Sequence, residues 1–250
     1  MKLNVHFSPS QTDELYFSGK TSVVIDVLRA TTTIITALSN GAKEVIPVNS
    51  VEFAMKVSGN AFGGQTLLGG ERNTKKIEGF QLGNSPFEYS REIVAGKSII
   101  LFTTNGSKAI VKAKFSENLY ICSFLNLHSI AEQLVSLNKD VEILCAGRSG
   151  SFCIEDSICA GKLIGEILKL KEDADLTDSA KASVVLSKSY GKSIPKILSE
   201  CEHGKLLIEN GFEQDINYCA KIGAMEIIPF YSGGTIKTLN LPHKNEVQGQ

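Results

Sequence analysis

The stretch VVIDVLRATTTIITAL, residues 23–38, runs from a predicted strand through a polar turn into a predicted helix. Three consecutive apolar residues at its start are typical of a buried strand, and its apolar end is typical of a packed helix. Between them lie Asp26, Arg29 and three threonines, Thr31, Thr32 and Thr33. A turn into a helix needs a single capping side chain. An acid, a base and three hydroxyls together therefore indicate a functional site.

Short apolar runs alternate with helix-like segments on both sides of this stretch. The predicted strands are residues 3–8, 21–27, 44–49, 66–71, 98–103, 119–123 and 141–146, with EIIPFY and TIKTLN as closing strands. This alternation predicts an α/β fold with three layers, α/β/α, around a mostly parallel sheet. Residues 153–225 are expected to be mostly helical, in three helices that start near ICAGKL, DSAKAS and GKLLIE. We expect one domain over residues 1–250, with this helical portion as a cover or a second lobe.

Composition excludes several classes of function. Of 250 residues, 42% are hydrophobic, and 26 Lys and Arg residues balance 27 Asp and Glu residues. Without a basic surplus, nucleic acid is not an expected partner. No apolar run approaches the roughly 20 residues of a membrane span, and the start lacks the apolar core of a signal peptide. Six cysteines in apolar surroundings and four scattered histidines favour reduced thiols in a cytoplasmic protein over disulfides or zinc.

The loops after the strands contain the candidate ligand-binding groups, because ligands of parallel sheets bind beyond the carboxyl ends of the strands. Arg29 precedes three threonines, and Arg148 precedes Ser149 and Ser151, so each loop offers a guanidinium and hydroxyls at a helix start. Helix N-termini and arginine both favour anions. Capping hydroxyls and surface ion pairs are the alternative. Because TTNGS (103–107) and Arg72 would lie at the same edge, we favour an anion site.

Four acids are interleaved with these groups: Asp26, Glu71, Glu155 and Asp156. Mg²⁺ takes oxygen ligands and bridges carboxylates to phosphate oxygens, so a phosphate site containing acids predicts this ion. For Glu155 and Asp156, favourable charge at a helix start is an equal alternative. Asp26 lies within an apolar run and must have a partner.

Four further side chains each have a structural interpretation. In NSPFE, residues 84–88, Ser85 is predicted to cap a helix that begins at Pro86, with Glu88 completing a capping box. Cys145 is expected to be a buried thiol. For His203 two interpretations stay open: a proton donor, or a surface residue at a helix start.

Four blocks together resemble the 2-phosphosulfolactate phosphatase family, which has the ComB-like fold. They are IDVLRATTTI, GGERNTKKIEGFQLGNSP, LFTTNGSKAI and CAGRSGSFCIEDSICAG, and the resemblance extends from Val23 to Asp215. It implies a magnesium-dependent phosphatase that converts 2-phospho-3-sulfolactate to 3-sulfolactate and phosphate, a step toward coenzyme M. Such a substrate is a small polyanionic phosphorylated acid.

The resemblance also implies roles for residues at the motif positions. Catalysis would fall to Asp26, Arg29 and Arg148, and metal binding to Asp26, Glu71, Glu155 and Asp156. The implied substrate-binding residues are Thr31, Thr32, Thr33, Arg72, Asn84, Thr104, Asn105, Gly106 and Gly147. Attack by water and attack by Asp26 both stay open as mechanisms. A phosphatase or transferase for another small 2-phospho acid, or a noncatalytic anion-binding module, are the alternatives, and a homodimer is possible.

Overall fold

The computed structural model describes residues 1–58 and 66–239 of the chain. The described strands are β1 (Lys2–His6), β2 (Thr21–Ile25), β3 (Glu44–Val48), β4 (Thr66–Arg72), β5 (Lys75–Lys76), β6 (Ser98–Phe102), β7 (Asn118–Cys122), β8 (Val141–Cys145), β9 (Asp175–Leu176), β10 (Pro229–Ser232) and β11 (Thr235–Thr238). The described helices are α1 (Ala30–Ser39), α2 (Val51–Ser58), α3 (Arg91–Val94), α4 (Gly106–Lys112), α5 (Leu127–Leu137), α6 (Ile154–Leu170), α7 (Asp178–Tyr190), α8 (Ile194–Glu200), α9 (Glu202–Glu209) and α10 (Glu213–Cys219). Each strand predicted from the sequence is present.

The strands form one mixed sheet in the order β5-β4-β6-β3-β11-β10-β7-β2-β8-β1-β9. Pairing is parallel within β4-β6-β3 and within β7-β2-β8-β1-β9. The last two strands, β10 and β11, pair with each other as an antiparallel hairpin and are antiparallel to β7 and β3, their outer neighbours. A hairpin from the end of the chain therefore joins two parallel groups of strands.

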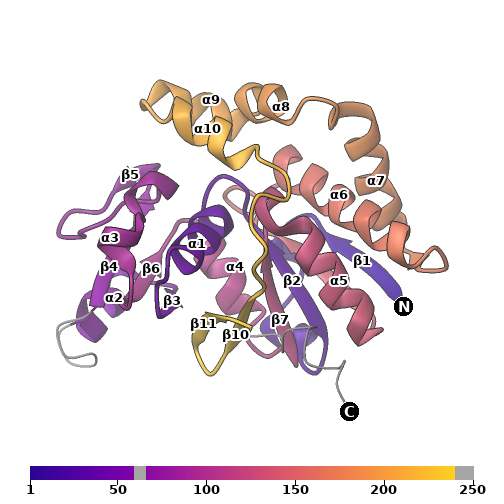
Figure 1. Ribbon diagram of the computed structural model, residues 1–250, viewed down its shortest axis with the longest axis horizontal. Coiled ribbons are helices and arrows are strands. Elements are labelled where there is room, and N and C mark those ends of the chain that lie inside the picture. Colours follow the sequence, from indigo (N-terminus) through magenta and orange to yellow (C-terminus); the bar gives the residue numbers. More distant parts are fainter. Residues whose placement is uncertain (59–65, 240–250) are drawn as a thin grey trace, which may run out of the picture.

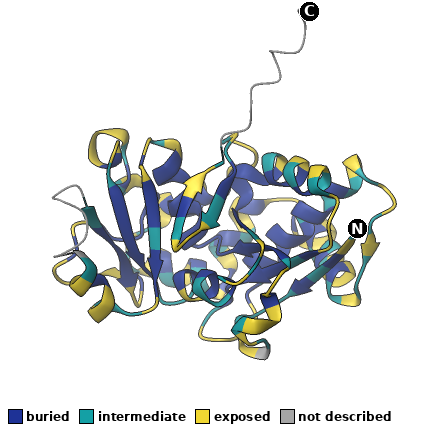
Figure 2. Ribbon diagram, turned by 90° about the horizontal axis from the view of Figure 1, so that it is seen from below, coloured by how far each residue is buried: buried dark blue, intermediate teal, exposed yellow. Residues whose placement is uncertain are grey.

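Alternating side chains of the buried strands contribute to three apolar clusters, and β2 contributes to two of them, on opposite faces of the sheet. In β2, Val23 and Ile25 contact the core that includes α5 and α6, whereas Val24 contacts the core that includes α1 and α4. This alternation is the period of two that a strand imposes on its side chains. Figure 2 shows the buried positions concentrated in the strands and on the inward sides of the helices. The three-layer α/β/α prediction is confirmed, with a sheet that is mixed.

The portion from residue 153 to 225 is mostly helical, as the sequence predicts. Figure 1 shows α8, α9 and α10 grouped at one end of the molecule and the β10–β11 hairpin toward the opposite end. Leu207 in α9 and Ile216 in α10 belong to the same core as Val23. The helix expected from GKLLIE onward is two helices, because the chain turns at Gly211, whose φ is +84°. The extent of a single domain stays a prediction.

Two further expectations concern cysteines and membranes. All six cysteines are free and buried, and burial raises the pKa of the Cys145 thiol well above its usual range. The prediction of a buried thiol at this position is confirmed. Of the helices in the described residues, none has the length and apolar character needed to cross a bilayer.

Candidate active site

Residues from the loops after β2, β4 and β6 line a small cavity, which we call the inner cavity. Its volume is about 10 Å³, which is the space that one water-sized sphere requires. Its polar lining consists of Asp26, Arg29, Glu71, Thr74, Asn84, Thr103, Asn105 and His203. The structure thus brings together several of the residues singled out from separate stretches of sequence.

Asp26 follows β2 directly and is 6% exposed. One carboxylate oxygen, Oδ1, accepts a hydrogen bond from the Ala30 amide at 3.2 Å, and no described group donates to Oδ2. The start of α4 packs closely here, because a Cβ at Gly106 would collide with Asp26 Oδ2. Burial raises the pKa of Asp26 to about 7, against the Ala30 hydrogen bond and with help from the charges of Glu71 and Glu155.

Glu71, at the end of β4, connects two loops. One of its oxygens accepts from the Thr104 amide at 2.7 Å and the other from the Thr74 amide at 2.8 Å. Three oxygens near this carboxylate are buried without a hydrogen-bond partner: Thr74 Oγ1, Asn84 Oδ1 and Thr104 Oγ1. Unpartnered buried oxygens are costly unless water, an ion or a ligand satisfies them.

Asp156, in the first turn of α6, connects the loops after β2 and β8. Its Oδ1 accepts from the Val27 amide at 2.9 Å, and its Oδ2 accepts from the Gly147 amide at 3.1 Å. Gly147 has φ +61°, and a Cβ there would collide with the Ser151 carbonyl. Burial raises the pKa of Asp156 well above its usual range, and the charge of Asp26 adds to this. What the structure shows for Asp156 is a loop tether, and its role as a metal ligand stays a prediction.

Glu155 and Arg148 lie beside His203. Burial raises the pKa of Glu155, whose Oε1 is 3.9 Å from His203 Nδ1. Burial, together with the charges of Arg148 and Arg29, lowers the pKa of His203 to about 4. This value makes His203 a neutral imidazole at neutral pH. Because His203 lines the inner cavity, it is not an open surface residue. Arg148 lines neither this cavity nor the one described below, and its Nη1 is 3.7 Å from Glu202 Oε2.

Arg29 is almost fully buried and has an acidic partner from a distant helix. Its Nη1 donates to Asp215 Oδ2 at 2.5 Å, and its Nη2 donates to the Thr74 carbonyl at 3.1 Å. The guanidinium also lies over the Phe212 ring, 4.2 Å from its centroid. The Leu28–Arg29 peptide bond is cis. Asp215 was missed from the sequence, where its only signal is that it closes the last stretch resembling the family.

The capping-box prediction for Ser85 and Glu88 is wrong. Ser85 precedes a 3₁₀-helix that begins at Pro86, as expected, but its side chain makes no cap hydrogen bond. The Ser85 hydroxyl donates to Asp215 Oδ1 at 2.8 Å, and Glu88 accepts from the Gly83 amide at 2.7 Å. A hydrogen bond to a carboxylate is stronger than one to a neutral amide, which explains why the Ser85 hydroxyl bonds to Asp215 and does not cap the helix.

The three threonines of the opening stretch are fully buried. Thr31 donates to the Asp26 carbonyl at 2.8 Å and accepts from the Asp26 amide, and Thr32 donates to the Val27 carbonyl at 2.9 Å. Thr33 donates to the Asn84 carbonyl at 2.9 Å. These bonds shape the loop and attach it to Asn84. Contact of the threonines with a substrate stays a prediction.

A second cavity of about 420 Å³, which we call the outer cavity, adjoins the first. Asn105 lines both cavities and accepts from the Ser149 amide at 3.1 Å. Thr104, Lys108 and Lys112 also line the outer cavity. Arg72 lines neither cavity and is exposed, with its guanidinium 5.8 Å from the centroid of the Phe102 ring.

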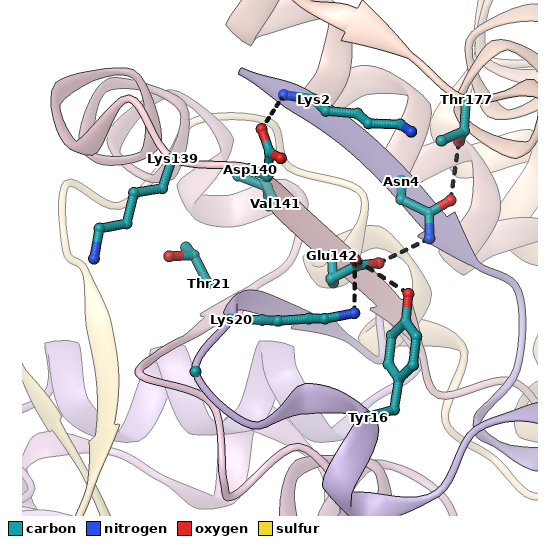
Figure 3. A pocket seen from close by; sticks show the side chains of 11 residues that line it. Lys2, Asn4, Tyr16, Lys20, Thr21, Lys139, Asp140, Val141, Glu142 and Thr177 are labelled. Carbon is teal, nitrogen blue, oxygen red and sulfur yellow. Dashed lines mark hydrogen bonds and ion pairs between the residues drawn. The ribbon is translucent and has the colours of Figure 1, made fainter.

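Another cavity, of about 560 Å³, lies at the amino ends of β1, β2 and β8 (Figure 3). Figure 3 shows Asn4, Tyr16 and Lys20 directed at the carboxylate of Glu142. None of the residues predicted for the site lines this cavity. Glu142, its half-buried acid, accepts hydrogen bonds from protein donors, so no ligand is needed to explain how these side chains are arranged.

Comparison with known proteins covers nearly the whole chain. The family model described as 2-phosphosulpholactate phosphatase matches residues 6–234. A protein of Clostridium acetobutylicum named "Probable 2-phosphosulfolactate phosphatase" is 40% identical over 236 residues, 94% of this chain and 100% of the relative. Proteins with the same name from Clostridium novyi and Caldanaerobacter subterraneus subsp. tengcongensis are 42% identical over 230 residues and 43% identical over 219 residues. These matches cover 92% and 88% of this chain, and 96% and 90% of the respective relatives.

Proposed function

This chain belongs to the 2-phosphosulpholactate phosphatase family, and we propose that it hydrolyses 2-phospho-3-sulfolactate to 3-sulfolactate and phosphate. The names of its relatives support this activity. The observation that carries the proposal is Asp26, whose buried carboxylate has an unbonded oxygen beside the unpartnered oxygen of Asn84 in the inner cavity. Buried oxygens of this kind are suited to a cation and a phosphoryl group.

Mg²⁺ is the cofactor that fits these donors. Among residues 1–58 and 66–239, no group of three His, Cys, Asp or Glu side chains is arranged to hold a metal ion. Mg²⁺ usually has only one or two carboxylate ligands from the protein and keeps water and phosphate oxygens for the rest. Asp26 and Glu71 would hold the ion, with Asn84 as a neutral oxygen donor, and Glu155 and Asp156 would support them. When bound, Mg²⁺ supplies positive charge to a nonbridging phosphate oxygen.

The chemistry assigned to this chain centres on Asp26. Burial raises its pKa to about 7 in the metal-free protein, and a cation bound beside it would favour the ionised carboxylate, which can act as a base. Asp26 either takes a proton from the attacking water or attacks phosphorus through Oδ2, and in both cases the bond from phosphorus to the C2 oxygen breaks. In the second case water then attacks the phosphorus of the aspartyl phosphate, which releases phosphate and restores the Asp26 carboxylate. The departing C2 oxygen takes up a proton. Arg29, which lines the inner cavity, keeps positive charge beside the reacting group.

Phosphate release from 2-phospho-3-sulfolactate, measured with and without Mg²⁺, tests the proposal. Magnesium-dependent release without any acceptor excludes a transferase. Binding of phosphate that is indifferent to Mg²⁺, without turnover, would indicate an anion-binding module and contradict the proposal. Rapid acid quenching of the reaction with substrate that carries a labelled phosphoryl group separates the two mechanisms, because only the aspartyl phosphate route leaves the label covalently bound to Asp26.

A place in coenzyme M biosynthesis, a cytoplasmic location and a homodimer are further parts of this proposal. The first is what the family resemblance implies, since hydrolysis of 2-phospho-3-sulfolactate is a step toward that coenzyme. The second is supported by six free, buried thiols.

A further inference from the structure

The inner cavity is too small to hold a three-carbon substrate. Its volume of about 10 Å³ accommodates one water-sized particle, such as an ion or a single oxygen. The outer cavity, at about 420 Å³, lies within the range of small-molecule sites. Asn105 lines both, so the two cavities lie against the same residue.

The charges of the outer cavity are positive. Lys108 and Lys112 lie one helical turn apart on α4 and line it, whereas no acidic side chain among residues 1–58 and 66–239 does so. Neither lysine forms an ion pair within the part of the chain that the structure describes. Lys108 contacts only an aromatic face, with its Nζ 5.9 Å from the centroid of the Phe102 ring. Two cations without acidic partners in a concave site favour an anionic ligand.

The arginines that the sequence suggested as anion-binding residues have other partners. Arg29 is buried against Asp215, and Arg148 Nη1 lies 3.7 Å from Glu202 Oε2. The outer cavity also includes Thr104, whose buried Oγ1 has no hydrogen-bond partner. A cavity with two unpaired ammonium groups and an unpartnered hydroxyl offers donors, which are the groups that bind an oxyanion.

We propose that Lys108 and Lys112 bind the acidic group of the substrate that is remote from the phosphate, with Thr104 as an additional donor. This inference rests on the proposed function, in which that group is the sulfonate. One phosphate oxygen reaches the inner cavity beside Asp26, and the rest of the substrate, including the sulfonate, stays in the outer cavity. Lys108 and Lys112 thus determine specificity and take no part in bond breaking.

The test compares two substrates, 2-phospho-3-sulfolactate and 2-phospholactate, which lacks the sulfonate. Lys108→Ala and Lys112→Ala are each expected to raise the KM for the sulfonated substrate about tenfold, the effect of one charge-assisted hydrogen bond. The kcat should change little, because the sulfonate is bound equally in the ground and transition states. The KM for 2-phospholactate should not change. Lys188→Ala, on the exposed side of α7, is the matched control, and thermal unfolding checks the fold of each variant.

An equal rise in KM for both substrates would assign the lysines to the phosphate or carboxylate and overturn the inference, as would no change. Calorimetric binding of 3-sulfolactate provides a readout without turnover, and the lysine variants should weaken it about tenfold as well. Absence of phosphate release from the wild-type protein, with lysine-dependent 3-sulfolactate binding, would refute the proposed function alone. Turnover that is insensitive to both lysines would refute the specificity inference alone.

Discussion

At the scale of single residues, Asp26 combines the properties that a catalytic carboxylate needs and that a stable fold avoids. It is buried, other acids surround it, and one oxygen lacks a hydrogen bond. The same burial that raises its pKa to about 7 makes its ionised form costly in the metal-free protein. Activity and stability are therefore expected to oppose each other at this position.

Asp26→Asn is expected to abolish phosphate release while stabilising the metal-free protein at pH 8 by roughly 4 kcal/mol. The folded pKa, about 7, exceeds the usual 3.8. The native state therefore holds this proton more tightly than the unfolded state, and wild-type stability is lost as the pH rises from about 4 to 7. The asparagine has no such loss. Urea unfolding at pH 5 and pH 8 measures the difference, which should shrink at pH 5. If the difference in unfolding free energy between the variant and wild type were the same at both pH values, this account would be contradicted.

Asp215 is the second decisive residue, because it neutralises Arg29. Asp215→Asn leaves a buried guanidinium without a charged partner, and we expect a loss of roughly 3–5 kcal/mol in the free energy of unfolding. Because Asp215 also holds Arg29 in place at the inner cavity, kcat should fall by more than KM changes. Asp178→Asn, at an exposed position paired with Lys181 at 3.6 Å, is the control and should change neither quantity measurably. Retained stability in Asp215→Asn would refute the ion pair.

At the scale of elements, the β10–β11 hairpin and helix α10 bring the end of the chain to structures formed by its beginning. The hairpin pairs with β7 and β3, and α10 supplies Asp215 to the loop after β2. Joining the two parallel groups depends on the hairpin, whose Ile236 is fully buried in the core shared with Val24 and Ile99.

Truncation of this side chain tests the hairpin. Ile236→Ala is expected to lower the free energy of unfolding by about 3 kcal/mol, the usual cost of removing a buried aliphatic side chain. Thr238→Ala, two residues along the same strand at an exposed position, should cost far less. Chemical denaturation of both variants measures the contrast. Equal effects would show that the hairpin is not integral to the core.

At the scale of the whole molecule, the two ends of the strands in the parallel group β7-β2-β8-β1-β9 have different roles. The carboxyl ends of β2 and β8 lead into the candidate site, and the amino ends surround Glu142 (Figure 3). That carboxylate accepts from Asn4 and Tyr16 and pairs with His6 and Lys20. Burial opposes its ionisation, but the hydrogen bonds of His6 and Asn4 and the charge of Lys20 prevail and lower its pKa to about 2.

Glu142→Gln is therefore expected to reduce stability without reducing kcat. The folded pKa lies below the usual 4.5, so the ionised carboxylate stabilises the protein above about pH 4.5, and this contribution disappears as the pH falls toward 2. We expect a loss of roughly 1–3 kcal/mol at pH 7 and a smaller difference from wild type at pH 3.5. Unfolding curves and phosphate release at both pH values check this. A fall in kcat at pH 7 would show that the amino ends of these strands are coupled to the candidate site at their carboxyl ends.

Much of the site follows from local sequence. Asp26, Glu71 and Asn105 could be recognised because each follows a short apolar strand, and carboxyl ends of strands are where ligands bind. The side chains that depend on distant partners could not be recognised. Thr31, Thr32 and Thr33 hydrogen-bond to carbonyl groups, and no local pattern distinguishes a hydroxyl that binds an anion from one that binds backbone.

The sequence by itself determined the α/β class, the strand positions, the polar loops and the family, because period, turn chemistry and motif spacing are local properties. The tertiary structure alone decided three matters. It inserted the last two strands between β3 and β7, paired Arg29 with Asp215, and drew Ser85 away from its predicted cap toward that acid. Each of these joins segments more than a hundred residues apart, where burial and charge neutralisation outweigh local preference.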